Sequence, residues 1–507
     1  MSRFQTAINR LDRWFASSWM TATDAVLLPP GAPFSTSQRW IQRAWVSTLY
    51  LGGLGLWVFF LNFGRFKWGV QDWILEWRYS RILQEALTKG VLPLHTNLAT
   101  EYGVTRFLGI PDVPLSLQIP LLLFMDAAGA FLVHWLVMYS VSFAGCLLLR
   151  SRLRLSITAF TVVAMLFHFN GFITAHLGIG HTLFIGYFFF PYFVLLVLQL
   201  TQGQSGRAWF AWMALVLFGM ELVGTTQLYT ACLMFLGVLL VFSPGARGPL
   251  FKSLVAGVVL HAFRIAPAFL SLSGYSSRPL PGYLTLGDLL QALTWIVPAG
   301  KADKFITGLP VGWWELDMYV GILGFLGIIY FGVWRAWKRM PNDTPGASTM
   351  SLGASVLVFT VFSIGYLYWP INYLPLPLVK FVHVPSRFFV LPLLFLGTFA
   401  ASQVQAWLDL RRLGPWRRAV VLAALAVFIH DLVQHARLWR VEHVYESFLE
   451  APLDYSLQIV TRSDPTYVTI LVLSSLVSLL SLAYVVRILF LARRESSAGR
   501  MNSTPRA

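Results

Sequence analysis

The stretch KWGVQDWILEWRYSRI, residues 67–82, follows the first long apolar run of the chain, which covers residues 46–63. It places two carboxylates, Asp72 and Glu76, four residues apart and soon after the end of that run. Acids beside a bilayer are either part of a solvated surface or the reacting groups of a membrane protein. The rest of the sequence indicates which kind of protein carries them.

Composition and hydropathy predict a membrane protein. Hydrophobic residues make up 57% of the 507 residues and charged residues only 12%, whereas soluble proteins carry about 25% charged residues. The apolar residues form runs close to the roughly 20 residues that cross a hydrocarbon layer. We therefore predict an all-α polytopic membrane protein with about twelve transmembrane helices. The candidate spans lie near residues 46–63, 127–149, 155–170, 183–200, 208–224, 227–243, 253–270, 317–334, 351–368, 388–406, 419–430 and 467–487.

The connectors between the spans fall into two sets that alternate along the chain. One set, which includes both chain ends, carries 23 of the 38 Lys and Arg residues but only five acids. Short loops rich in Lys and Arg remain in the cytoplasm, so we expect a cytoplasmic N-terminal segment at residues 1–45 and a cytoplasmic tail at 493–507. The first span then serves as an uncleaved insertion signal, and a bacterial inner membrane is the expected location.

Composition and motifs argue against several other classes. The net charge of +16 follows from the asymmetric loops and favours contact with anionic lipids; we expect no nucleic-acid partner, because basic and aromatic residues are not interleaved on one surface. The two cysteines, Cys146 and Cys232, lie inside apolar runs and are expected to be buried and unpaired. The sequence contains no phosphate-binding loop, zinc-protease motif or serine-hydrolase motif.

The second set of connectors is long, and loops of more than about 15 residues tend to be functional. We expect the functional site on this non-cytoplasmic side. The assigned parts are a transmembrane core at residues 46–406 with non-cytoplasmic loops 64–126, 271–316 and 369–387, and C-terminal spans at 407–492 with loop 431–466.

The first of these loops predicts amphipathic helices that lie in the membrane interface. After Glu76, apolar residues recur at helical spacing between charged ones until Gly90 and Pro93, a pattern typical of an interfacial helix. A second, irregular interfacial stretch follows and places Asp112 between two prolines. Near the C-terminus, loop 431–466 predicts another amphipathic helix, with His435 on its solvated face.

The order of these motifs resembles the GT-C superfamily of membrane glycosyltransferases, and most closely its YfhO-like branch. The resemblance covers roughly residues 46–406 and begins with the acid after the first span and the amphipathic helix. The further segments that carry it are GVLPL (90–94), GIPDVP (109–114), HLGIGHTLFIGYFFFPYFVLL (176–196), ELVGTTQ (221–227), RIAPAFLSLSGYSSRP (264–279), WWELDMYVGILG (313–324) and LPLVKFVHVPSRFFVLPLL (376–394).

The resemblance implies transfer of a sugar from a polyprenyl-phosphate donor to an acceptor at the non-cytoplasmic face. Asp72 and Glu76 are then the candidate catalytic residues, because a carboxylate can take the proton of an acceptor hydroxyl. The leaving phosphate needs positive charge, which an Arg fork supplies well. The candidates for that role are Arg387, Lys380 and Arg264.

Other polar residues in the motifs are candidate substrate contacts. His176 and His181 lie five residues apart, off the same-face helical spacing, but they converge if the Gly-rich turn breaks the helix. Glu315 and Asp317 either bind sugar hydroxyls or a divalent cation, or cap the following helix. The metal-ligand set stays open. Gln227 and Asp112 are further candidates, and Glu221 is an intramembrane acid with Gln227 or Arg264 as expected partners.

Two other functions remain open. The acids after the first span are four residues apart, the GTTQ element lacks the His often found there, and the C-terminal extracytoplasmic part is reduced to residues 431–466. These departures from the family pattern favour a catalytically inactive GT-C-like subunit of a larger membrane complex. A lipid or solute transporter is the third hypothesis, although intramembrane charge is sparse.

Overall fold

The computed structural model describes residues 18–275, 280–302, 311–335, 338, 349–373, 382, 384–409 and 413–501. Within this part of the chain, regular structure is almost entirely helical, and the strands that form a ladder are the two-residue segments β1 (His95–Thr96) and β2 (Ile459–Val460). The predicted all-α polytopic membrane fold is confirmed. Cys146 and Cys232 are both buried and free, as expected.

Each of the twelve predicted spans falls on a helix, but they differ in length. Six described helical segments are long and apolar enough to cross a membrane, or seven if one bent pair counts as a span. That pair, Thr226–Phe242 and Pro244–Leu260, turns by 119° at its break, because Pro cannot continue a helix. The six are Ala127–Leu153, Ile157–Gly178, Thr182–Thr201, Pro385–Leu408, Pro415–Leu438 and Pro465–Glu495.

The first predicted span falls on the 25-residue helix Thr36–Phe60, and the other remaining apolar segments form shorter helices that pack among the long ones. Four of them have 10–17 residues, namely Trp209–Leu222, Ala262–Ser271, Gly321–Arg335 and Met350–Phe362. The helices of the bundle are α2 (Thr36–Phe60), α5 (Ala127–Leu153), α6 (Ile157–Phe169), α7 (Gly171–Gly178), α8 (Phe190–Thr201), α9 (Trp209–Leu222), α10 (Thr226–Phe242), α11 (Arg247–Leu260), α12 (Ala262–Ser271), α14 (Gly321–Gly327), α16 (Thr349–Phe362), α17 (Val390–Asp409), α18 (Pro415–Leu438) and α20 (Pro465–Met501).

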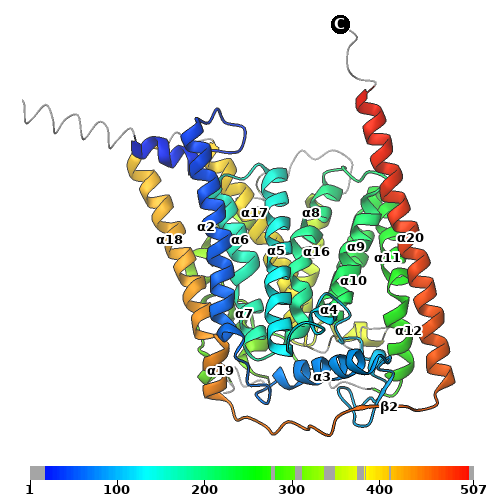
Figure 1. The fold of residues 1–507 in the computed structure, drawn as a ribbon. Coiled ribbons are helices and arrows are strands. Elements are labelled where there is room, and N and C mark those ends of the chain that lie inside the picture. Colours follow the sequence, from blue (N-terminus) through cyan, green and yellow to red (C-terminus); the bar gives the residue numbers. More distant parts are fainter. Residues whose placement is uncertain are drawn as a thin grey trace, which may run out of the picture.

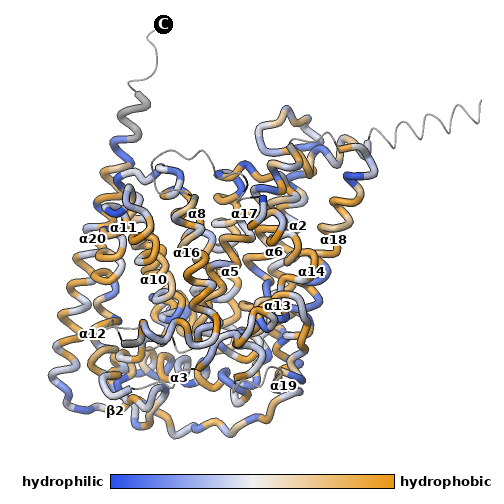
Figure 2. Tube along the Cα trace, turned by 180° about the vertical axis from the view of Figure 1, so that it is seen from behind, coloured by the Kyte–Doolittle hydropathy of each residue, from blue (hydrophilic) through white to orange (hydrophobic). Residues whose placement is uncertain are grey.

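The helices stand side by side in one bundle, with α18 and α20 at its two flanks and α3 (Trp73–Lys89) lying across its lower end (Figure 1). Apolar residues dominate the long helices through the middle of the bundle, and hydrophilic residues gather toward both ends (Figure 2). The start of α2 and the end of α20 lie at the same, upper end. That this end faces the cytoplasm stays a prediction from the loop charges.

Helix α3 forms where the sequence predicts an amphipathic helix. It buries Trp73, Trp77, Ile82 and Leu83 on one face and ends at Gly90. Gly90 adopts a left-handed conformation with φ of 63°, the usual way for a helix to stop. The helix therefore covers the lower end of the bundle with its apolar side.

The start of α3 is fastened to the turn that follows α7. The indole Nε1 of Trp73 donates to the Gly178 carbonyl at 3.1 Å, and the backbone N–H of Asp72 donates to the Ile179 carbonyl at 3.1 Å. Gly180 has φ of 97°, and a Cβ there would lie 2.3 Å from the backbone nitrogen of Trp73. Only glycine permits this approach.

A long connector crosses the lower end between α19 (Val441–Ser447) and α20 (Figure 1). It pairs β2 with β1 in an antiparallel register that places His95 opposite Val460. Asp464 then joins Arg106 at 2.7 Å and His95 at 3.3 Å. The first loop and the last connector, far apart in sequence, are thereby held together under the bundle.

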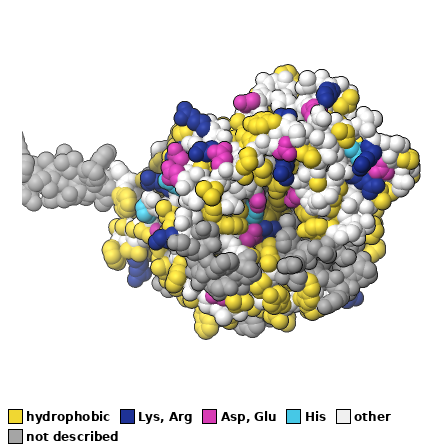
Figure 3. Space-filling model, turned by 90° about the horizontal axis from the view of Figure 1, so that it is seen from below, with side chains coloured by type: hydrophobic (Ala, Val, Ile, Leu, Met, Phe, Trp, Pro, Cys, Tyr) yellow, Lys and Arg dark blue, Asp and Glu magenta, His cyan; other side chains and the backbone are white. Residues whose placement is uncertain are grey.

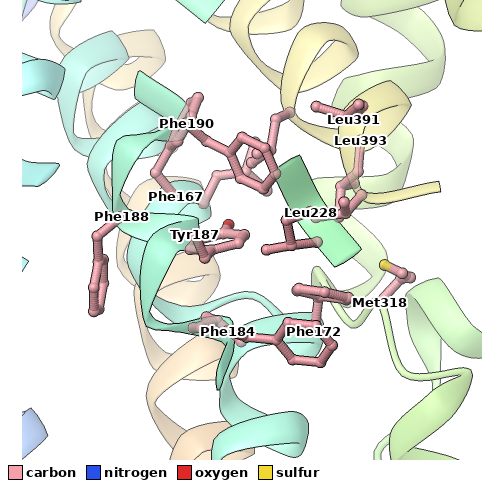
Figure 4. Close-up of a cluster of buried hydrophobic side chains, with 14 of the residues drawn as sticks. Phe167, Phe172, Phe184, Tyr187, Phe188, Phe190, Leu228, Met318, Leu391 and Leu393 are labelled. Atoms are coloured by element: carbon pink, nitrogen blue, oxygen red, sulfur yellow. The ribbon is translucent and has the colours of Figure 1, made fainter. Parts of the chain in front are cut away.

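The middle of the bundle is closed by aromatic rings. Phe172, Phe184, Tyr187, Phe190 and Leu228 come from α7, η3 (Thr182–Phe189), α8 and α10 and pack against one another (Figure 4). All are nearly or fully buried. Dense packing of this kind leaves few voids larger than a water molecule.

The expectation that His435 lies on a solvated face is wrong. His435 is fully buried; its Nε2 lies 3.0 Å from a carboxylate oxygen of Asp317, and its Nδ1 lies 3.0 Å from the Thr174 hydroxyl. The helical pattern of residues 431–438 continues α18 up to Leu438 and leads His435 inward. Buried polar groups need such partners, so this set ties α7, α18 and the segment before α14 together.

We expect His435→Ala to destabilise the protein, because the Asp317 carboxylate loses its imidazole partner in a dry core. The carboxylate keeps its bonds from Trp313 and Tyr319, so the loss is one hydrogen bond to a charged group, which costs about 1.5–3 kcal/mol. The melting temperature of the purified protein in detergent should fall by several degrees. His430→Ala, on the same helix, is the matched control because the His430 side chain is 66% exposed; equal melting temperatures for both variants would contradict the structural role.

Candidate functional site

The site begins at the lower end of the bundle, where α3 starts. A carboxylate oxygen of Asp72 lies 2.6 Å from Nε2 of His181. The Asp72 side chain is 42% exposed and the His181 side chain 9%. The carboxylate therefore faces the opening, and the imidazole contacts it from the interior of the bundle.

His181 connects this carboxylate to deeper groups. Its Nδ1 lies 2.7 Å from Nδ1 of His176, so one of these two nitrogens donates and the other accepts. Its Nε2 lies 4.0 Å from an oxygen of Glu315. The Gly-rich turn thus breaks the helix and brings the two histidines together. This break is the condition that the sequence spacing set for their convergence.

An ion pair forms the floor of the site. Arg387 donates from Nε and Nη2 to the two oxygens of Glu315, each at 2.7 Å, and from Nη1 to the side-chain oxygen of Gln227. Its guanidinium also lies 5.0 Å from the centre of the Phe184 ring. This bidentate geometry is the strong form of an Arg–carboxylate contact.

Six of the predicted residues therefore form one cluster. They come from the start of α3, from α7 and the turn after it, from the first turn of α10, and from two short 3₁₀ helices, η6 (Trp313–Glu315) and η10 (Pro385–Phe389). Seen from below, the molecule is hollowed near its centre, where acidic, basic and histidine side chains gather (Figure 3). The cluster consists of Asp72, His176, His181, Gln227, Glu315 and Arg387.

Electrostatics keeps both acids of the cluster ionised. Burial raises the pKa of Asp72, but the charge and hydrogen bond of His181 and the charge of Arg387 outweigh it, so the pKa lies below its ordinary value. Burial likewise raises the pKa of Glu315, and the charge of Arg387 with those of His176 and His181 lowers it to about 2. Asp72 thus presents a stable negative charge at the mouth of the site.

Glu76 lies one turn further along α3 in a separate pocket. It is almost fully buried and accepts hydrogen bonds from Ser80, at 2.9 Å, and from Gln118. Burial raises the pKa of Glu76 above its ordinary value. Asp112 lines the same cavity, whose volume of about 10 Å³ holds roughly one water molecule. Glu76 is therefore not brought next to the Asp72–His181 pair.

Asp112 belongs to a neighbouring set of acids and tyrosines that sequence patterns did not reveal. Tyr102 donates to Asp112, and Tyr79 donates to Glu101. Burial, followed by the charge of Asp112, raises the pKa of Glu101 to about 8, and burial also raises the pKa of Asp112. No local motif marks Glu101, because its partner Tyr79 lies on α3, 22 residues earlier in the chain.

Arg264 and Glu221 lie apart from the cluster. Arg264 is buried and donates to the backbone carbonyl of Val113. Glu221 is fully buried and accepts from the Thr226 hydroxyl at 3.0 Å, while Gln227, one of its two expected partners, is bound by Arg387 instead. Among the described residues, no hydrogen bond or ion pair joins Arg264 to Arg387 or Glu315, and the phosphate-binding role of Arg264 stays a prediction from the sequence.

The last two candidates are Lys380 and Asp317. Lys380 lies outside the described residues. Asp317 is fully buried and accepts from the Trp313 indole at 3.0 Å and from the Tyr319 backbone N–H at 3.0 Å, in addition to its contact with His435. It fixes the segment that carries Glu315, two residues earlier in the chain.

A divalent cation has one candidate ligand set among the described residues. His176, His181 and Glu315 each offer a ligand atom, and these atoms lie within 4.8 Å of one another. Both Glu315 oxygens, however, already accept from Arg387, and the two imidazoles share a hydrogen bond through Nδ1. As arranged, these residues do not fit a metal ion, because the guanidinium would have to leave first.

Comparisons with known proteins give a distant structural similarity. No protein-family model and no curated protein matches the chain. Among solved structures, the arabinofuranosyltransferase AftD from mycobacteria is similar, with 14% sequence identity and a TM-score of 0.46 over 79% of this chain. The match spans 27% of that protein's length. The function of this chain is therefore inferred from its own site.

We expect Arg387→Gln to destabilise the protein strongly, since it leaves the buried Glu315 carboxylate without its cation. Breaking a buried ion pair from one side costs about 3–5 kcal/mol, which thermal unfolding in detergent would detect. The double variant Glu315→Gln/Arg387→Gln removes both charges and should recover much of this loss. A double variant that melts no higher than Arg387→Gln would show that the pair is not the source of the effect.

The acid–tyrosine set predicts a pH dependence of stability. Because the folded-state pKa of Glu101 is raised to about 8 from 4.5, the folded state holds a proton that the unfolded state has lost over that interval. Its contribution is complete below pH 4.5 and disappears as the pH rises through 8. Melting temperatures measured from pH 5 to 8.5 should fall, and Glu101→Gln should flatten the decline. The exposed Glu446→Gln should keep the wild-type slope; equal slopes for all three proteins would refute the assignment.

Proposed function

We propose that this chain is a GT-C-type glycosyltransferase related to the YfhO-like branch. In this proposal it transfers a sugar from a polyprenyl-phosphate donor to an acceptor hydroxyl at the end of the bundle covered by α3. The observation that carries the proposal is the Asp72–His181 pair, an ionised and partly exposed carboxylate at the mouth of a charged hollow. The sequence resemblance supplies the donor class.

Asp72 acts as the base in the proposed reaction. The acceptor oxygen attacks the anomeric carbon as the bond from that carbon to the phosphate oxygen breaks. The acceptor proton passes to Asp72, and the bonding electrons leave with the polyprenyl phosphate. General-base catalysis of this kind contributes typically 10²–10⁴-fold to a rate. The 2.6 Å contact with His181 holds the carboxylate toward the opening.

Positive charge for the leaving phosphate comes from the Arg387 side of the hollow. Three of the five N–H donors of Arg387 serve Glu315 and Gln227, so those partners fix the direction of the guanidinium plane. We assign Lys380 the same phosphate-binding role from the sequence alone. The Arg387 guanidinium occupies both oxygens of Glu315, where a metal ion would otherwise bind. Arg387 therefore supplies the positive charge that a metal ion would supply in its place.

An inactive structural subunit is the second candidate. The observation that favours it is that Arg387 already binds both oxygens of Glu315 and the side-chain oxygen of Gln227. These contacts reduce the positive charge available to the phosphate of a lipid-linked sugar. A transporter is less favoured, because aromatic side chains fill the bundle next to the site (Figure 4). Transport would require a path to both faces.

We expect Asp72→Asn to lower the transfer rate by about 10²–10⁴-fold while leaving the melting temperature close to that of the wild type. The assay follows radiolabelled sugar leaving a panel of polyprenyl-phosphate sugars in proteoliposomes that hold the purified protein and cell-envelope acceptors. Asp454→Asn, on the lower connector, is the matched control and should retain full activity. Chelator and added Mg²⁺ or Mn²⁺ form parallel arms, and we expect neither to change the rate.

The outcomes separate the hypotheses. Wild-type activity in Asp72→Asn would reject the base assignment. Metal-dependent activity would show that a cation displaces Arg387 from Glu315. No turnover of any donor, together with stoichiometric purification in a larger complex that Asp72→Asn leaves intact, would replace the transferase with the structural subunit.

A further inference from the structure

A groove lies between three helices near the upper end of the bundle, far from the proposed site. It has a volume of about 730 Å³ and runs between α9, α11 and α20. Its apolar wall includes Val255, Val259 and Leu480, and Leu480 is 72% exposed. The groove therefore opens sideways, where the surrounding helices are apolar (Figure 2).

The upper end of this groove is basic. Arg207 precedes α9, and Lys252 lies on the second turn of α11; both line the groove. Glu495 approaches Arg207 at 3.4 Å, but the two side chains are 86% and 62% exposed, so this contact is a weak surface pair. Both cations are therefore open to an anionic partner from outside.

The groove changes character along its length. Lys252, Val255 and Val259 follow one another at intervals of three and four residues on one face of α11, over about 10 Å at 1.5 Å per residue. Tyr484, which is 57% exposed, lines the opposite wall on α20. A ligand that matches this gradient has a negative head and an apolar chain.

We propose that the groove binds an anionic glycerophospholipid. Its phosphate would contact Arg207 and Lys252, and one acyl chain would lie along Val255, Val259 and Leu480. Basic pockets between helices at the cytoplasmic side of membrane proteins bind such headgroups, and the loop charges predict that this end faces the cytoplasm. The lipid would connect α20 to α9 and α11, and this role is independent of sugar transfer.

Native mass spectrometry of the purified full chain tests the proposal. The protein is titrated with phosphatidylglycerol or phosphatidylcholine of identical acyl chains, and we expect at least tenfold tighter binding of phosphatidylglycerol. Arg207→Ala/Lys252→Ala should reduce this preference to near onefold. Val255→Trp, which fills the apolar part, should weaken the binding of both lipids. The matched control is Arg152→Ala/Arg417→Ala, two exposed basic residues outside the groove, and it should keep the preference.

Three results would overturn the proposal. Equal binding of the two lipids would remove the role of the headgroup charge. An equal loss in the control pair would show diffuse attraction to a basic surface. Displacement of phosphatidylglycerol by millimolar inorganic phosphate, with no effect of Val255→Trp, would show an anion site without a lipid chain. A melting temperature measured for each variant confirms that the compared proteins are folded.

Discussion

The close approach of Gly180 to the start of α3 is the constraint on which the candidate site depends. Two hydrogen bonds from Asp72 and Trp73 to the turn after α7 fix this junction, and the positive φ of Gly180 makes room for it. The same turn carries His181. One backbone arrangement therefore anchors the interfacial helix and also places the imidazole next to the Asp72 carboxylate, on its interior side. A side chain at position 180 would separate the two parts of the site.

The ion pair between Glu315 and Arg387 gives the site its second fixed point. It joins two short 3₁₀ helices that are 72 residues apart in the chain, and its bidentate form restricts both side chains. Burying two charges costs several kcal/mol of desolvation, which the paired geometry, Gln227 and the Phe184 ring offset. Such a pair contributes less to net stability than to fixing the direction of its two side chains.

The two ends of the bundle differ in character, and the packed middle separates them. The lower end gathers the first loop, the last connector and the charged hollow, whereas the upper end carries basic residues and the groove between α9, α11 and α20. The rings around Phe184 close the region next to the hollow (Figure 4). The proposed sugar transfer would take place at the lower end alone, in keeping with this asymmetry.

Hydropathy and spacing in the sequence determined the helical membrane fold, the amphipathic α3 and the list of polar residues in which the cluster was found. Periodicity reports which residues are apolar along one helix, so it could not show that α10 and α11 turn by 119° or that His435 points inward. Only the tertiary structure decided that Asp72 meets His181 while Glu76 faces another pocket, and that Arg387 pairs with Glu315. These contacts join segments more than 70 residues apart, and no local pattern records such distances.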